Sequence, residues 1–215
     1  MRLSEITEDS IRRVFRSYFA LLLILWILFV LYPNPFNLVI SIQRVFSVDV
    51  DPGAVGTILG DFPSDPTAIE KAVLERIPYR YDWEVYSMPW YFPTVEQVLG
   101  KGEGDCKARA LVLASIFEAK NIPYRIDLSP IHMWVDYEGK GETSIENAGV
   151  KFYQQDPETG EKSFQLPKIE LREAMDYFWQ GFWSPMPEVR RALLLVGLAA
   201  LVTFRVIWFR KETAE

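Results

Sequence analysis

Two predominantly apolar stretches lie near the two ends of the chain, at residues 18–32 and 192–209. The first has no charged side chain, and the second has only Arg205, which lies close to the basic residues that follow it. A helix rises about 1.5 Å per residue, so these stretches would reach about 22 and 27 Å across a hydrocarbon core about 30 Å thick. Snorkelling arginines can supply the remaining length. The chain is therefore expected to cross a membrane twice.

Each stretch has an alternative interpretation. The arginines before residues 18–32 are also typical of a signal peptide, but residues 33–40 offer no small-x-small cleavage site, so an uncleaved anchor is favoured. Residues 192–209 could form a buried core helix, but a stretch that is apolar around its whole circumference fits lipid better.

Basic residues at the two ends predict the orientation. Four arginines lie in residues 1–17, and Arg205, Arg210 and Lys211 lie at the other end, so both termini are expected in the cytoplasm and the central domain outside it. The expected order is a cytoplasmic juxtamembrane segment (1–17), a first transmembrane helix (18–32), a linker or interfacial segment (33–63), a folded domain (64–180), an interfacial aromatic segment (181–191), a second transmembrane helix (192–209) and a cytoplasmic tail (210–215).

Composition excludes several classes of function. The formal net charge of −6 argues against a nucleic-acid partner. A single cysteine rules out an internal disulfide, and with a single histidine it also rules out a Cys/His zinc cage. No spaced acidic loop predicts a cation site, so neither a metal nor a cofactor is expected.

Capping residues predict where the helices of the central domain begin. Asp65 is expected to cap a helix that ends before Pro78, and Thr94 and Gln97 have capping-box spacing for a short helix over 95–99. After these, four segments have strand character, at 124–128, 131–137, 142–146 and 150–155, and residues 168–179 are expected to form a closing helix. An α+β fold, with a central helix packed on an antiparallel sheet, is the prediction.

The single cysteine stands at the start of the predicted central helix. Asp105 is well placed to cap that helix, which would end near Lys120, so Cys106 lies in its first turn. Exposed amides and the positive end of the helix dipole favour a negative sulfur there. His132 is the only histidine, and a nearby imidazole is the usual means of activating a thiol.

The motifs around these two residues resemble the transglutaminase-like superfamily, over residues 64–155. That resemblance implies a transglutaminase-like or papain-like core, in which a cysteine at a helix start faces a histidine and an aspartate on neighbouring strands. The motifs are Tyr-x-Tyr-Asp (79–82), Pro-Thr-x-x-x-x-Leu (93–99), Gly-x-Gly-Asp-Cys (102–106), Asn-Ile-Pro-Tyr-Arg (121–125) and His-Met-Trp-Val (132–135).

The resemblance also assigns roles to individual residues. Cys106 is similar to the family's nucleophile and His132 to its base. At the position of the third residue, normally an aspartate, this chain has Glu146, and Asn147 could serve instead. The backbone amide of Cys106 is the expected oxyanion donor. Asp105 and Trp90 are the further substrate or oxyanion candidates, with Trp90 expected on position alone to help form the acyl-acceptor cleft.

Two functions from different classes follow. The first is an enzyme of thiol acyl transfer, a protease, amidase or transamidase, whose partners are a peptide or protein substrate at the outer membrane face and the lipid bilayer. The second is a catalytically inactive transglutaminase-like subunit that serves as a binding or assembly module beside other subunits of a membrane complex. Two alternative interpretations remain open. In one, Asp105 serves only as a helix cap; in the other, the aromatic loop 83–92 only packs around the helix and forms no substrate groove.

Overall fold

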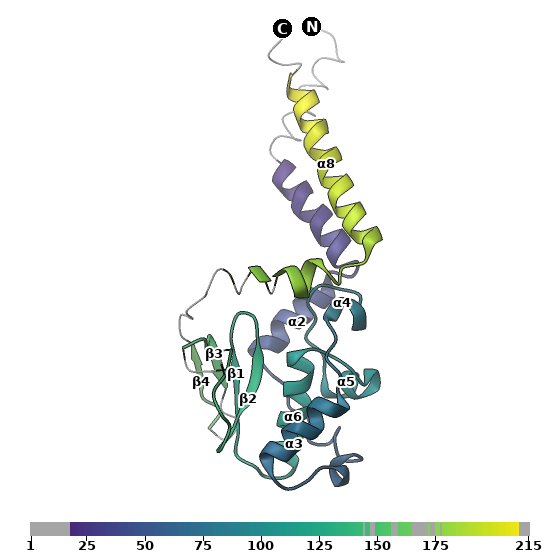
Figure 1. The fold of residues 1–215 in the computed structure, drawn as a ribbon. Coiled ribbons are helices and arrows are strands. Elements are labelled where there is room, and N and C mark those ends of the chain that lie inside the picture. The colour runs from purple at the N-terminus through teal and green to yellow at the C-terminus, as the bar shows by residue number, and fades with distance from the viewer. Residues whose placement is uncertain are drawn as a thin grey trace. The chain divides into compact units, whose positions relative to one another are not determined.

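The computed structural model describes residues 18–143, 145–146, 149–155, 159–164, 172, 175–176 and 178–210 (Figure 1). These residues divide into two compact units. The central unit is Leu38–Pro185, and the terminal unit comprises the described residues up to Asn37 and from Met186 onward.

Side-chain caps fix where the helices of the central unit begin. Asp65 accepts a backbone hydrogen bond of 2.8 Å at the start of the first predicted helix, and Thr94 and Gln97 form the predicted capping box. The capping-box helix runs two residues past its predicted end, and Gly102 closes it at a φ of 70°, a left-handed conformation that glycine adopts easily. The helical elements are α2 (Phe36–Phe46), η1 (Leu59–Asp61), α3 (Pro66–Arg76), α4 (Asp82–Val85), α5 (Val95–Lys101), α6 (Cys106–Ala119) and the π-helical turn η2 (Phe178–Trp183).

The described strands form a four-stranded antiparallel sheet in the order β2-β1-β3-β4. In its register Leu128 pairs with Met133 on one side and with Tyr153 on the other. The strands are β1 (Arg125–Leu128), β2 (Met133–Asp136), β3 (Tyr153–Gln155) and β4 (Lys162–Phe164). The predicted α+β class is confirmed.

The prediction of a strand at 142–146 is wrong for the four of these residues that the structure describes. Thr143 and Glu146 turn toward each other: the amide of each donates to the carbonyl of the other, at 3.1 and 3.4 Å, and the Thr143 hydroxyl also accepts from the Glu146 amide. Backbone groups used within such a turn cannot pair with a neighbouring strand. The fourth strand is instead β4, which was not predicted. The predicted helix at 168–179 lies largely outside the described residues.

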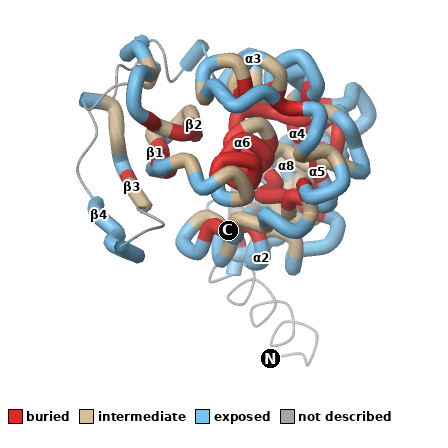
Figure 2. Tube along the Cα trace, turned by 90° about the horizontal axis from the view of Figure 1, so that it is seen from below, coloured by how far each residue is buried: buried red, intermediate tan, exposed pale blue. Residues whose placement is uncertain are grey.

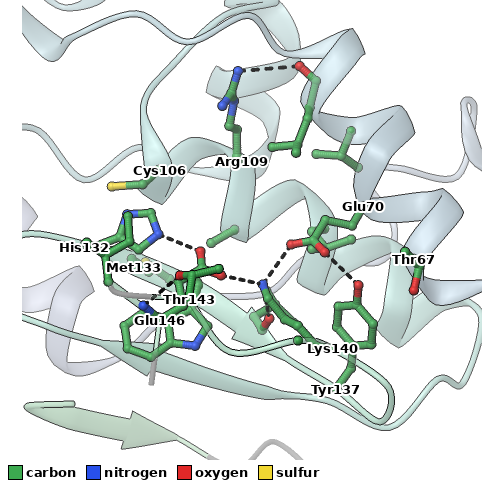
Figure 3. A pocket seen from close by; sticks show the side chains of 18 of the residues that line it. Thr67, Glu70, Cys106, Arg109, His132, Met133, Tyr137, Lys140, Thr143 and Glu146 are labelled. Atoms are coloured by element: carbon green, nitrogen blue, oxygen red, sulfur yellow. Dashed lines mark hydrogen bonds and ion pairs between the residues drawn. The ribbon is translucent and has the colours of Figure 1, made fainter. Parts of the chain in front are cut away.

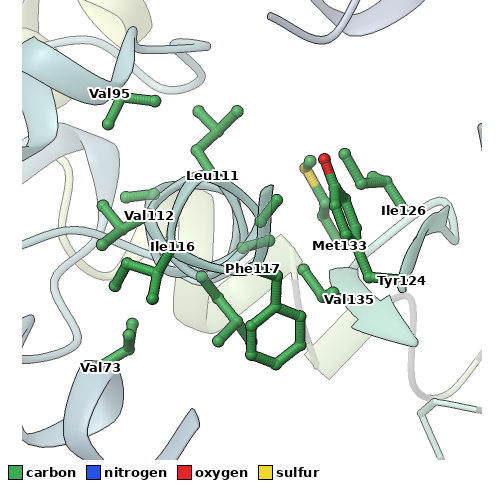
Figure 4. Close-up of a cluster of buried hydrophobic side chains, with 14 of the residues drawn as sticks. Val73, Val95, Leu111, Val112, Ile116, Phe117, Tyr124, Ile126, Met133 and Val135 are labelled. Carbon is green, nitrogen blue, oxygen red and sulfur yellow. The ribbon is translucent and has the colours of Figure 1, made fainter. Parts of the chain in front are cut away.

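Helix α6 forms the centre of the hydrophobic core. It contacts β2 on one side and α3 and α5 on others, and it is buried over most of its length (Figure 2). A helix buried around its whole circumference needs no polar face, which explains why its sequence shows little amphipathic pattern. Phe117 packs edge-on against Tyr124 and Tyr137, with ring centroids 6.2 and 5.2 Å apart. Other members of the core, several drawn in Figure 4, are Ile69, Val73, Val95, Val98, Leu111, Val112, Ile116, Ile126, Met133 and Val135.

The terminal unit pairs the helix Tyr18–Leu31 with α8 (Glu188–Arg210). Gly197 allows a close approach, because an added Cβ there would overlap the ring of Trp26. The Arg205 guanidinium lies 4.4 Å from the centre of the Phe19 ring. In the part of the chain that the structure describes, no helix by itself has both the length and the apolarity needed to cross a bilayer, although the helix Tyr18–Leu31 and α2 satisfy both as an interrupted pair.

Candidate active site

Cys106 is the first residue of α6, as predicted, and its side chain is almost completely buried. The preceding chain is held in place by backbone hydrogen bonds: the Gly104 amide donates to Pro78, and its carbonyl accepts from Arg80. A Cβ on Gly104 would overlap the methyl group of Ala108, so this approach to the helix requires glycine. The start of α6, and with it the sulfur, is thereby fixed relative to the rest of the unit.

A buried ion cluster supports the same helix start. Asp105 caps the helix by accepting from the Lys107 amide at 3.0 Å, and its other carboxylate oxygen contacts the Lys107 ammonium. That ammonium lies 2.9 Å from Asp82, which also accepts from the Tyr91 amide at 2.8 Å. Burial raises the pKa of Asp82 from 3.8 to about 6, against the attraction of Lys107. The carboxylate of Asp105 therefore serves in capping and ion pairing.

His132 directly precedes β2 and is held by a tight turn. Its amide donates to Ser129 Oγ at 2.9 Å, and its carbonyl accepts from the Ser129 amide at 2.7 Å. The imidazole ring stacks on Trp134, with centroids 5.9 Å apart and an angle of 14° between the planes. These contacts leave the ring little freedom to rotate.

The ring of His132 lies beside Cys106 and binds a carboxylate. Nε2 lies 2.7 Å from Glu146 Oε1, and the thiol and the imidazole line the same two cavities (Figure 3). Because Nε2 is taken by Glu146, Nδ1 is the nitrogen available to the sulfur. Asn147, the other candidate for the third position, lies outside the described residues. Glu146 is therefore the acid that the described structure brings to the imidazole.

The environment of His132 favours the imidazolium form. Burial lowers its pKa, but hydrogen bonds to Cys106 and Glu146 and attraction to both groups outweigh burial and raise the pKa from 6.5 to about 9. Burial also raises the pKa of Glu146, yet its contacts with His132 and Lys140 leave that pKa below its ordinary value.

Two residues that were not predicted from the sequence support Glu146: Lys140 binds it directly, and Glu70 binds Lys140. Lys140 Nζ lies 3.2 Å from Glu146 Oε2, 2.8 Å from Glu70 Oε1 and 2.9 Å from the Val135 carbonyl. Glu70 in turn accepts from the Tyr137 hydroxyl at 2.6 Å. Neither residue could be picked out from the sequence, because a polar residue in a turn or on a helix gives no signal of a partner distant along the chain.

Two cavities meet at the reacting pair, and both are lined by Cys106 and His132. The larger has a volume of about 590 Å³ and includes Glu70, Lys140 and Glu146 in its wall. The smaller, of about 260 Å³, has mainly apolar walls. Trp90 lies in the wall of the smaller cavity, which Cys106 also lines.

The chain matches no protein-family model, no curated protein and no solved structure. Its function therefore has to be inferred from the residues and geometry of this site.

Metal binding finds no support at this site. Among the described residues, no group of three or more histidine, cysteine, aspartate or glutamate side chains could hold an ion. The chemistry that the arrangement can perform is nucleophilic attack by sulfur, with proton transfer through the imidazole.

Proposed function

We propose that the chain is a membrane-anchored thiol acyl-transfer enzyme of the transglutaminase-like type, which acts on peptide or protein amides. The observation that carries this proposal is the grouping of Cys106, His132 and Glu146, in which Nε2 of the histidine lies 2.7 Å from the carboxylate and the thiol lines the same cavities as the imidazole. The series stands at the junction of two cavities, so a substrate carbonyl can approach the sulfur from either one.

In the proposed reaction the sulfur of Cys106 attacks the amide carbon, and the carbonyl oxygen becomes an oxyanion. The amide of Cys106, at the positive end of α6, is the proposed donor to that oxyanion. The proton on His132 Nδ1 passes to the leaving nitrogen as the C–N bond breaks, which gives a thioester and a free amine. Glu146 holds the ring in place and stabilises its positive charge.

A second nucleophile then releases the acyl group from the sulfur. Water attacks the thioester carbon while His132 takes up a proton, and the products are a carboxylic acid and the restored thiol and imidazole pair. If a primary amine attacks instead, the product is a new amide. We propose hydrolysis as the main reaction, because water reaches the site without a dedicated binding surface.

We also propose that the terminal unit anchors the enzyme in a lipid bilayer, with the central unit on the outer face. Support comes from the surface of α8. Its exposed side chains are largely apolar, which is costly in water and favourable in lipid. They include Leu193, Leu195, Val196, Val202, Phe204, Val206 and Ile207.

The rate of iodoacetamide alkylation of Cys106, measured by mass spectrometry from pH 5 to 10, tests the proposed chemistry. The enzyme requires rapid alkylation well below pH 8, and the His132→Gln variant should then react at least tenfold more slowly at pH 6.5, because the cation facing the sulfur is lost. Alkylation that begins only above pH 8 and is unchanged in His132→Gln would refute the enzyme. That result would favour the alternative function, a binding module without catalytic activity.

A further inference from the structure

The smaller cavity beside Cys106 has walls of a different character from the larger one. Besides the start of α6, four segments contribute side chains to it. These are Val45 from α2, Trp90 from the loop before α5, Leu128 at the end of β1 with Ile131 from the following connection, and Phe152, which directly precedes β3. All five are apolar or aromatic. A hollow of this kind, next to a nucleophile, gains free energy when an apolar group displaces its water.

The polar side chains in this wall are already engaged with other groups. Ser129 Oγ accepts from the His132 and Ile131 amides, at 2.9 and 3.4 Å, and its hydroxyl donates to the His132 carbonyl. The Lys107 ammonium is held by two buried carboxylates. A polar or charged substrate side chain would therefore lose water here without gaining equivalent hydrogen bonds.

The larger cavity suits the departure of the leaving amine and the entry of the nucleophile that releases the acyl group. Glu70, Lys140 and Glu146 give its wall charged groups, and its volume of about 590 Å³ is within the range of ordinary ligand sites. Water or an amine that releases the acyl group must reach the thioester beside His132, and the leaving amine must depart by the same histidine. A wide cavity with charged groups in its wall accommodates both movements.

We propose that the smaller cavity is the acyl-side subsite for a bulky apolar side chain, so that the substrate is a peptide with Leu, Ile, Met or Phe next to the amide that is broken. This inference rests on the proposed function. It assigns Trp90 to the acyl-donor side, opposite to the acceptor side expected from sequence position. Burying one such side chain corresponds to about a 10- to 100-fold preference over a polar one.

Two peptidyl acyloxymethyl ketones that differ only in the residue next to the ketone, Leu or Asp, test the subsite. The thiolate of Cys106 displaces the carboxylate from the methylene carbon, and a stable thioether forms while the carboxylate leaves. Labelling of the full chain in lipid nanodiscs is followed by mass spectrometry. We expect the Leu probe to react at least tenfold faster than the Asp probe.

Two matched variants locate the preference in one cavity. Phe152, in the smaller cavity, is 38% exposed, and Leu74, in the larger, is 44% exposed, so each tolerates a change to aspartate without loss of the core. Phe152→Asp should abolish the Leu preference, and Leu74→Asp should retain it. Equal labelling by the two probes in the unmodified protein, or the opposite behaviour of the two variants, overturns the subsite.

Iodoacetamide separates failure of the subsite from failure of the proposed function. If His132-dependent alkylation occurs but neither peptidyl ketone labels Cys106, the subsite is wrong and the acyl-transfer chemistry stands. If that alkylation is also absent, the proposed function fails and the subsite fails with it.

Discussion

Glu146 Oε1 lies 2.7 Å from His132 Nε2, although Glu146 belongs to a turn and not to a strand. The family that the motifs resemble normally has the shorter aspartate on a strand at this point. Here the extra methylene of glutamate and the different backbone path occur together, and Lys140 holds the second carboxylate oxygen at 3.2 Å. The longer glutamate side chain thus reaches the imidazole from a turn instead of from a strand.

His132 should titrate near pH 9 in the intact protein. Because it is the only histidine, its imidazole signals in NMR spectra need no assignment. Hydrogen bonds to Cys106 and Glu146 overcome the effect of burial and raise the pKa to about 9. In Glu146→Gln the pKa should fall, since one of the two acidic partners is gone. A midpoint at or below pH 6.5 in the unmodified protein contradicts the assigned hydrogen bonds.

The raised pKa of His132 also makes the free energy of unfolding depend on pH. The folded pKa of His132, about 9, lies above its unfolded value of about 6.5, so the stabilisation is complete below pH 6.5 and is lost as the pH rises to 9. The melting temperature should therefore decline over this interval. The His132→Gln variant should show a flatter profile, and identical slopes for the two proteins would count against the assignment.

Lys140→Met should slow the alkylation of Cys106 by about tenfold at pH 6.5, because Glu146 loses the cation that orients it. Lys140 also helps to keep the pKa of Glu146 low, so that pKa should rise and the acid limb of the alkylation profile should move to higher pH. Iodoacetamide kinetics across pH measure both effects. Lys140→Arg should restore most of the rate, since it keeps the charge.

The control for Lys140 is Lys120→Met. Lys120 donates to the Phe62 carbonyl at 3.1 Å and follows the far end of α6. The Lys120→Met variant should be less stable than the unmodified protein, but Cys106 should keep the same pH profile of alkylation. Equal profiles for the Lys140 and Lys120 variants would mean that Lys140 has a purely structural role.

Much of the fold could be predicted from the sequence, because its signals are local. The caps at Asp65 and Asp105, and the capping box at Thr94, each specify a helix start from residues within one turn. The strands at 125–128 and 133–136 follow from alternation and a short connection. The segment 142–146 was mistaken for a strand because it follows a Gly-Lys-Gly turn and because its own residues give no sign of the turn that Thr143 and Glu146 form.

The candidate site was predictable in part, for the same reason. Cys106 and His132 stand out because each is the only residue of its type and each lies in a recognisable motif. Lys140, Glu70 and Asp82 act through partners that are 6 to 70 residues away, and no local pattern encodes such pairs. Lys107, next to the cysteine on a largely apolar helix, was a local signal of a buried ion cluster.

Lys107→Met should destabilise the protein by about 3–5 kcal/mol, because it leaves Asp82 and Asp105 buried without their cation. This corresponds to a loss of roughly 10 °C in melting temperature. Arg80→Met is the matched control: Arg80 also lies between two carboxylates, Glu84 and Glu103, but the three side chains are 41–54% exposed. Its loss should cost about 1 kcal/mol or less, and equal melting temperatures for the two variants would contradict the role of Lys107.

The single cysteine also allows a direct test of the proposed topology. Cys106 borders two cavities, so a small, membrane-impermeant methanethiosulfonate cation can reach it in intact cells if the central unit lies outside the cytoplasm. We expect labelling of the unmodified protein without permeabilisation and none of Cys106→Ser. Adding Thr213→Cys to Cys106→Ser moves the thiol to the predicted cytoplasmic tail, where labelling should require permeabilisation. The reverse pattern, with Cys106 protected and Thr213→Cys exposed, would invert the proposed orientation and move the substrate to the other side of the membrane.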